Sequence, residues 1–131
     1  MSKPVVFLDF DGVLNDLWEE NGYAMRGELD PARVAVLNEI LEATGAEVVL
    51  STTWHKLLGG EEAWQRLRAA GLREGTVLRG TTPFKSSYRS NEIEWYLRDH
   101  PEVQTYVILD DDATLVRLRQ ASSVADVMEI L

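Results

Sequence analysis

The sequence predicts a three-layer α/β domain built on a mainly parallel sheet. Short apolar runs typical of buried strands alternate along the chain with segments of helical spacing. Three of these runs end in acidic or hydroxyl residues, which is typical of parallel strands whose carboxyl ends meet at one edge of a sheet. The 131 residues, of which 45% are hydrophobic, suffice for one domain with its own core.

The elements can be placed in order along the chain. An apolar strand covers 4–8, and a helix follows that has Asp30 as its N-cap, Pro31 as its first residue and Gly45 at its end. Apolar spacing and turn residues predict the other elements, which are strands at 47–50, 76–78 and 105–109 and helices at 61–70, 90–99 and 113–120. Strands that alternate with helices imply a sheet covered on both faces.

Two aspartates stand at the end of the first apolar run. Asp9 follows the run directly, and Asp11 and Gly12 come just after it. Asp11 and Gly12 could simply form a turn, as these residue types often do. A turn does not explain Asp9, because a carboxylate at the end of a buried strand is costly unless something pairs with it. We therefore expect both aspartates to be functional.

The last predicted strand ends in three consecutive acids, Asp110, Asp111 and Asp112. Asp112 could cap the following helix, and the other two could be solvated. A divalent cation with oxygen ligands would instead neutralise the remaining acids together with those after the first strand. The two acidic strand ends favour a Mg²⁺ site, with candidate ligands Asp9, Asp11, Asp110 and Asp111.

The strand predicted at 47–50 ends in the hydroxyl residues Ser51, Thr52 and Thr53. Hydroxyls and backbone N–H groups at a strand end suit phosphate oxygens. Ser and Thr also begin loops and cap helices, so this signal is weak alone. Its place between the two acidic strand ends predicts that Ser51 and Thr52 bind phosphate, with Gly12 nearby.

In this order the motifs resemble those of the haloacid dehalogenase-like (HAD) superfamily, most members of which are Mg²⁺-dependent phosphatases and phosphotransferases. The resemblance rests on 9–13, Ser51, a basic residue before a helix, and Asp110-Asp111. A narrower resemblance, to the small HAD domains associated with Swiss Army Knife RNA-repair proteins, rests on 50–54, 91–97 and 106–112. Both imply a Rossmann-like domain.

The resemblance implies a phosphomonoester hydrolase that works through an aspartyl-phosphate. Asp9 would be the nucleophile, and Asp11 would protonate the leaving oxygen and later accept a proton from water. Mg²⁺ would bridge Asp9, the phosphoryl group and Asp111, which neutralises charge around the attacking carboxylate. Ser51 would hold a phosphoryl oxygen.

A cation completes such a site, and two basic residues precede the helix predicted at 90–99. Arg89 lies just before Ser90, which would be a good N-cap, and we expect Arg89 to be the catalytic cation. Lys85 is the second candidate. The alternative is that both are solvated surface residues.

Composition limits the remaining possibilities. Without cysteine the chain can form neither a disulfide nor a thiolate metal site. No signal peptide or apolar stretch of membrane-spanning length is visible, so we expect a cytoplasmic protein without membrane contacts. The net charge of −9 argues against nonspecific nucleic-acid binding. Residues 55–90 nevertheless carry seven basic and three acidic side chains, which could guide a phosphorylated nucleic-acid end into the site.

The intervals between the motifs are too short for a folded cap domain. We therefore expect one HAD-like catalytic domain over 1–131, with an open site and a flap at 15–29. Trp18 and Tyr23 in this flap could stack on a base or simply pin the flap to the domain.

Two aromatic residues follow the hydroxyl motif closely. Trp54 is expected to pack in the domain, although it could also line the mouth of the pocket. For His55 a contact with phosphate or the leaving group and a solvated position are both open.

Three classes of function fit these residues. The first is a Mg²⁺-dependent phosphatase, acting on nucleic-acid termini or alternatively on a small metabolite or nucleotide. The second is a phosphate-binding module without turnover, such as a receiver domain, but a receiver has its acceptor aspartate on a middle strand, where this chain has Ser51. The third is a phosphotransferase or dehalogenase on the same scaffold, of which a dehalogenase would not need the full metal set.

Overall fold

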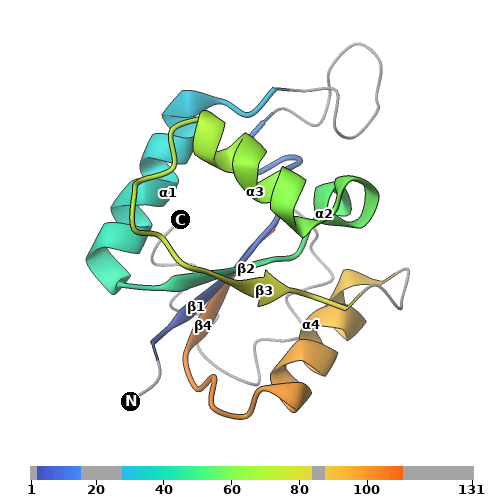
Figure 1. The fold of residues 1–131 in the computed structure, drawn as a ribbon. Coiled ribbons are helices and arrows are strands. Elements are labelled where there is room, and N and C mark those ends of the chain that lie inside the picture. Colours follow the sequence, from blue (N-terminus) through green and yellow to red (C-terminus); the bar gives the residue numbers. More distant parts are fainter. Residues whose placement is uncertain (1–2, 16–27, 84–87, 111–131) are drawn as a thin grey trace.

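The computed structural model of the chain describes residues 3–15, 28–83 and 88–110. Within them lie four strands and four helices, none of which is long and apolar enough to cross a bilayer (Figure 1). In chain order they are β1 (Val5–Leu8), α1 (Pro31–Thr44), β2 (Glu47–Leu50), α2 (Thr53–Leu58), α3 (Gly60–Ala69), β3 (Leu78–Thr81), α4 (Arg89–Asp99) and β4 (Tyr106–Leu109). Most of the predicted flap at 15–29 and the whole helix predicted at 113–120 lie outside the described residues.

The four strands form one parallel sheet in the order β3-β2-β1-β4. In the register of this sheet, Leu8 at the end of β1 lies opposite Leu50 of β2 and Leu109 of β4. These three strands therefore end at the same level. The residues that follow them meet at one edge of the sheet, as the sequence predicted.

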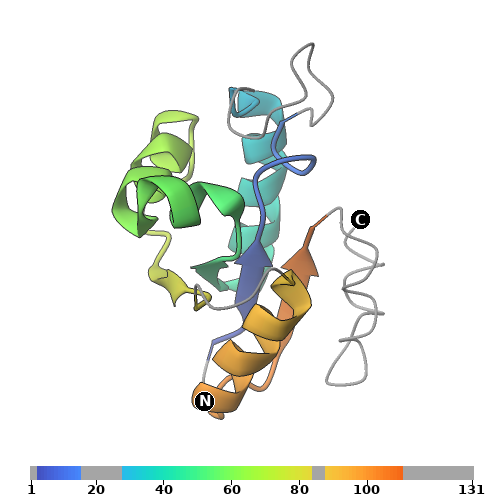
Figure 2. The same ribbon diagram turned by 90° about the vertical axis from the view of Figure 1, so that its right-hand side faces the viewer.

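The two faces of the sheet are covered by different helices. Val6 and Leu8 of β1 belong to the core cluster that includes α1 and α3, whereas Val5 and Phe7 belong to the cluster under α4. Phe7 packs edge-on against Tyr96 of α4, with ring centroids 5.6 Å apart. Figure 2 shows α4 on one side of the sheet and α1 and α3 on the other. The prediction of a three-layer α/β domain is confirmed, and burial on both faces explains why β1, β2 and β4 are largely apolar.

The residues that predicted the start and the end of α1 take the expected places in the structure. The Asp30 side chain accepts a hydrogen bond from the N–H of Ala32, and Pro31 is the first helical residue. Gly45 ends the helix in the left-handed conformation, with φ of 68°, which a residue without a side chain adopts at little cost.

The strand predicted at 76–78 is wrong in position, because β3 runs from Leu78 to Thr81. Pairing with β2 continues past Leu78, and the N–H of Thr82 still donates to the carbonyl of Leu50. The residues that extend the strand include Arg79 and Gly80, which give no apolar signal. Backbone pairing and the packing of Gly80 against Tyr96 thus outweigh a weak local preference.

Two helices also differ from the prediction: α4 has another start, and α2 was not predicted. α4 begins at Arg89 after Tyr88, which makes no side-chain cap hydrogen bond, so Ser90 lies inside the helix and is not the N-cap. The six-residue helix α2 was not predicted at all. Its N-cap is Thr52, so the hydroxyl motif after β2 also serves to start a helix.

Candidate active site

The candidate site lies where β1, β2 and β4 end. Asp9, Ser51 and Asp110 each follow the last residue of one of these strands. The N–H of Asp9 donates to the carbonyl of Leu109 at 3.0 Å, and the N–H of Ser51 donates to the carbonyl of Leu8 at 2.9 Å. Backbone hydrogen bonds of the sheet therefore fix the positions of these residues.

Asp9 is buried and held at both carboxylate oxygens. Its Oδ1 accepts from the N–H of Phe10 at 2.8 Å, and its Oδ2 accepts from Nη1 of Arg89 at 3.1 Å. The pKa of Asp9 is raised to about 7, mainly by burial and secondly by the charge of Asp110, while Arg89 acts in the opposite direction. Burial and the neighbouring acid together thus outweigh the effect of the guanidinium.

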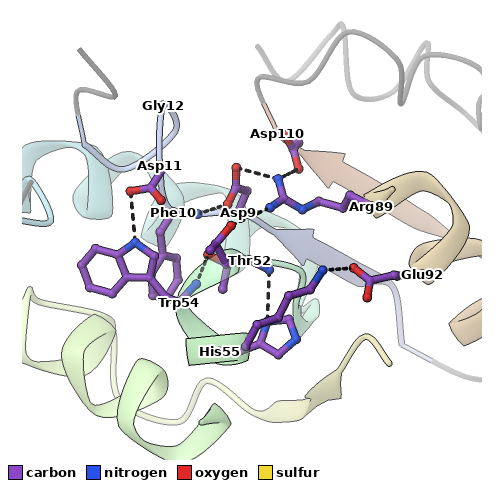
Figure 3. A network of polar contacts seen from close by, with 12 residues as sticks. Asp9, Phe10, Asp11, Gly12, Thr52, Trp54, His55, Arg89, Glu92 and Asp110 are labelled. Carbon is purple, nitrogen blue, oxygen red and sulfur yellow. Dashed lines mark hydrogen bonds and ion pairs between the residues drawn. The ribbon is translucent and has the colours of Figure 1, made fainter. Parts of the chain in front are cut away.

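Arg89 joins three elements at this edge of the sheet (Figure 3). Its Nη1 donates to Asp9 and, at 2.9 Å, to Oδ2 of Asp110, while Nη2 donates to the Thr53 hydroxyl at 3.3 Å. As the first residue of α4, it reaches the acids across the carboxyl ends of the strands. The structure thus places Arg89 among the acids, whereas Lys85 lies outside the described residues.

Ser51 lies between the two acidic strand ends, as predicted. Its side chain is 1% exposed, and within the described part of the chain its hydroxyl has no hydrogen-bond partner. A buried polar group normally has a partner, so the Ser51 hydroxyl is a position at which a ligand oxygen would be accommodated.

Thr52 is largely committed to the start of α2. Its side-chain oxygen accepts from the N–H of Trp54 at 3.2 Å, and its own N–H donates to Nδ1 of His55 at 3.1 Å. The Thr52 side chain also accepts from the backbone N–H of His55, which together with the Thr52 N–H to His55 contact forms a capping box with histidine in place of the usual Glu or Gln. Of the predicted phosphate contacts of Thr52, only the hydroxyl proton is left over.

His55 is not solvated in this structure, and both of its ring nitrogens have partners within the protein. It is buried, with Nδ1 accepting from Thr52 and Nε2 lying 3.3 Å from the carbonyl of Thr82. This geometry fits a neutral imidazole that carries its proton on Nε2. Burial lowers the pKa of His55, and the ammonium of Lys56 acts in the same direction.

The loop after β1 turns Asp11 toward different partners from those of Asp9. Oδ1 of Asp11 accepts from Nε1 of Trp54 and from Nδ2 of Asn15, each at 3.0 Å. Gly12 has φ of 80°, which closes this turn, and its N–H donates to Oδ1 of Asn15 at 3.1 Å. The predicted phosphate-binding amide of Gly12 is therefore occupied within the loop.

Sequence reasoning missed the polar role of Trp54. It is buried and packs edge-on against Phe10, as expected, with ring centroids 5.2 Å apart. Its indole N–H, however, reaches a candidate catalytic carboxylate 43 positions earlier in the chain. The available signal was a tryptophan in the first turn of a helix that starts at the site edge, and the unpredicted α2 hid it.

A buried ion pair lies one helical turn beyond Arg89. Glu92 of α4 is fully buried, and Nζ of Lys56 on α2 pairs with its Oε1. The pair connects the two helices that supply Thr53 and Arg89 to the site. No sequence pattern relates the two residues, and the pairing was not predicted.

Comparison with known protein families agrees with the motif order. The model of the family described as the HAD domain in Swiss Army Knife RNA repair proteins matches residues 5–126. The chain belongs to this family. Comparisons with curated proteins and with solved structures found no match. The resemblance inferred from the motifs is thereby confirmed, and a HAD-type phosphatase is the general function that membership supports.

HAD domains generally use Mg²⁺, and the acids of this site fit part of that requirement. The side chains of Asp9 and Asp110 are both buried beside the guanidinium of Arg89, and carboxylate oxygens are the ligands that a hard cation prefers. Among the described residues no three His, Cys, Asp or Glu side chains gather as a metal site. Asp111, the remaining predicted ligand, lies outside those residues.

Proposed function

We propose that this HAD domain is a Mg²⁺-dependent phosphatase that forms an aspartyl-phosphate on Asp9. The observation that carries the proposal is the placement of buried Asp9 between a backbone N–H, Arg89 and Asp110 at the carboxyl edge of the sheet. A buried carboxylate held in one orientation is suited to attack on phosphorus, and positioning is the main contribution to phosphoryl transfer.

In the first step an oxygen of Asp9 forms a bond to phosphorus while the bond to the leaving oxygen breaks. In the second step water attacks the same phosphorus and frees Asp9. Arg89 donates to the phosphoryl oxygens and keeps the carboxylate in place, and the Ser51 hydroxyl supplies a further donor where it now has no partner.

The proposal assigns the metal to Asp9 and Asp110, with Asp111 as a further ligand. When bound, Mg²⁺ supplies positive charge to the phosphoryl oxygens and lowers their repulsion of the attacking carboxylate. Burial and the charge of Asp110 raise the pKa of Asp9 to about 7, and a cation at this point would offset both effects, which supports this assignment.

Asp11 is assigned to proton transfer instead of metal binding. Its Oδ1 is held by the N–H groups of two uncharged side chains, Trp54 and Asn15, which fix the orientation of the carboxyl group. The carboxyl group would protonate the leaving oxygen in the first step and take a proton from the attacking water in the second.

For the substrate we propose a phosphorylated nucleic-acid end. Support comes from the family, whose members occur in RNA repair proteins, and from the expected absence of a cap. The structure weakens one earlier argument, because four basic residues of 55–90 pair with carboxylates. These pairs are Lys56 with Glu92, Arg66 with Glu62, Arg79 with Glu47 and Glu102, and Arg89 with Asp9 and Asp110. Charge alone will therefore attract a polyanion only weakly.

The test measures phosphate release from 3′- and 5′-phosphorylated oligonucleotides, mononucleotides and sugar phosphates, each with Mg²⁺ and with EDTA. We expect Mg²⁺-dependent release with the highest kcat/KM on oligonucleotide ends and an advantage that shrinks as salt rises. A salt-independent preference for a small metabolite would reject the proposed nucleic-acid substrate but would still agree with a phosphatase. No release from any of these compounds with Mg²⁺ would reject the phosphatase.

A further inference from the structure

Two side-chain N–H groups converge on one oxygen of Asp11. The indole of Trp54 and the amide of Asn15 both donate to Oδ1, at 3.0 Å each. In Figure 3 this oxygen faces the indole, and the other carboxylate oxygen lies on the side nearer to Asp9. The charge of Asp11 also contributes to the raised pKa of Asp9, so the two carboxyl groups are close in space.

The two donors distinguish the oxygens of this carboxyl group. An oxygen that already accepts two N–H groups has little capacity left for a proton, because the proton would compete with the donors for its lone pairs. The proton of the neutral acid therefore belongs on Oδ2. The donors also resist rotation of the carboxyl group, which would otherwise exchange the two oxygens.

Both donors are themselves held firmly. Trp54 is 2% exposed, lies in the first turn of α2 and packs edge-on against Phe10, the residue between the two aspartates. Asn15 is buried as well, and its Oδ1 accepts from the N–H of Gly12, which fixes which end of its amide faces Asp11. The apolar core therefore determines the orientation of the acid.

From this geometry we propose that Trp54 is a positioning residue, which with Asn15 keeps the proton of Asp11 on Oδ2 facing the leaving group. The inference rests on the proposed function and adds a residue to it. As the bond between phosphorus and the leaving oxygen breaks, the Oδ2 proton moves to that oxygen and leaves its electron pair on Asp11. When water later forms its bond to phosphorus, one of its protons returns to Oδ2, and the group is restored.

The test compares the wild type with Trp54→Phe, which keeps an aromatic ring against Phe10 and removes the N–H. The kcat/KM is measured with Mg²⁺ for p-nitrophenyl, phenyl and ethyl phosphate, whose leaving groups need a proton to an increasing extent. Trp64→Phe is the matched control, since Trp64 is a buried tryptophan of the same core cluster on α3. Thermal unfolding and circular dichroism establish that each variant is folded.

We expect Trp54→Phe to lower kcat/KM for ethyl phosphate about tenfold, the usual effect of losing one hydrogen bond to a group that becomes charged as its proton leaves. For p-nitrophenyl phosphate, which departs without a proton, the loss should stay below about twofold by the same argument. Trp64→Phe should leave the ratio between the substrates unchanged. A structural defect would lower kcat/KM for all three substrates together, so the ratio of kcat/KM between substrates separates a positioning role from damage to the fold.

If Trp54→Phe unfolds, the sulfur isostere of tryptophan, benzothienylalanine, is introduced at position 54 to remove the N–H with almost no change of shape. A uniform loss across the three phosphates, or none at all, in either folded variant would overturn the inference while the phosphatase stands. A wild type inactive on all three substrates and on the phosphorylated oligonucleotides would overturn the proposed function and this inference together.

Discussion

The two sides of the candidate site hold the same kind of side chain in different surroundings. On one side, Asp9 and Asp110 share the guanidinium of Arg89. On the other, Asp11 is held by the neutral N–H groups of Trp54 and Asn15. Asp9 and Asp11 are two residues apart in the chain, but Asp9 forms an ion pair with Arg89, whereas Oδ1 of Asp11 accepts from two uncharged side-chain N–H groups.

This difference indicates how one loop can supply two kinds of chemistry. Burial and the charge of Asp110 raise the pKa of Asp9 to about 7, while Arg89 favours the ionised form that a nucleophile and a metal ligand need. The two N–H donors on Asp11 fix the orientation of its carboxyl group, which a group that transfers protons needs. Pairs of acids whose environments differ in this way commonly divide nucleophilic and acid–base roles between them.

The largest expected effect is on the charged side. Asp9→Asn should abolish turnover of every substrate, with a loss of at least about 10⁴-fold, because an amide cannot replace the attacking oxygen. The measurement is phosphate release with Mg²⁺, with circular dichroism to show that the sheet is intact. Equal activity of this variant and the wild type would refute the division of roles.

The next effect concerns the cation. Arg89→Ala should lower kcat/KM for all leaving groups by about 10²–10³-fold, as the loss of a charge-stabilising donor usually does. Arg89→Lys should recover only part of this, because an ammonium lacks the planar fork that contacts Asp9, Asp110 and Thr53. The matched control is Arg68→Ala, because Arg68 is an exposed arginine of α3.

A loss by Arg68→Ala as large as that by Arg89→Ala would show that the effect is one of overall charge. A comparison with Lys85→Ala tests the choice of cation, and we expect the smaller loss for Lys85→Ala.

The buried ion pair between Lys56 of α2 and Glu92 of α4 should contribute to the free energy of unfolding. Lys56→Met leaves the carboxylate of Glu92 buried without this ammonium, which should lower the free energy of unfolding by about 3 kcal/mol. The double variant Lys56→Met with Glu92→Leu should lose less, because the buried charge is also removed. Chemical denaturation measures both.

Arg66→Met is the control for this pair, since Arg66 and Glu62 form an exposed pair whose loss should cost at most about 0.5 kcal/mol. A double variant that is less stable than Lys56→Met would contradict the account of Glu92 as a buried charge that depends on Lys56.

The smallest expected effect is a pH dependence of the free energy of unfolding, caused by His55 near the start of α2. Because the folded state lowers the pKa of His55, the unfolded chain binds more protons below pH 6.5, and the contribution of neutral His55 to stability is lost as pH falls. His55→Gln keeps a side-chain acceptor without this titration. Relative to this variant, the wild type should lose about 1 kcal/mol, the usual worth of a helix cap, between pH 7.5 and pH 5.

Asp9 has the opposite dependence, since its raised pKa favours the folded state as pH falls below 7. This contribution is common to both proteins and cancels in the difference. A difference in unfolding free energy that does not change with pH would show that His55 does not titrate as described.

The sequence sufficed for what depends on local pattern. Apolar runs that end in polar residues correctly predicted the sheet edge at which Asp9, Ser51 and Asp110 meet. Arg89 was correctly expected at the start of a helix, but it is the first residue of α4 and does not precede it, and the expected cap at Ser90 was wrong. The roles of these residues remain predictions.

The contacts that were missed join residues far apart in the chain. Trp54 meets Asp11, and Lys56 meets Glu92, through the packing of α2. Such pairs have no periodic signature, because they depend on how whole helices pack and not on the residues next to them. The six-residue α2 itself was overlooked because its capping box uses His55, a residue type that is not a usual capping signal.

The central claim is that Asp9 is the nucleophile and Asp11 the acid–base group. In the most direct test, the Asp11→Asn variant reacts with p-nitrophenyl phosphate and Mg²⁺, and the reaction is quenched with acid. Borohydride then reduces any acyl phosphate, and mass spectrometry locates the modified residue. Because this substrate needs no proton to depart but the second step needs a base, the account predicts a burst of p-nitrophenol and homoserine at position 9. Modification at position 110, or an Asp11→Asn variant that turns over like the wild type without any trapped intermediate, would contradict it.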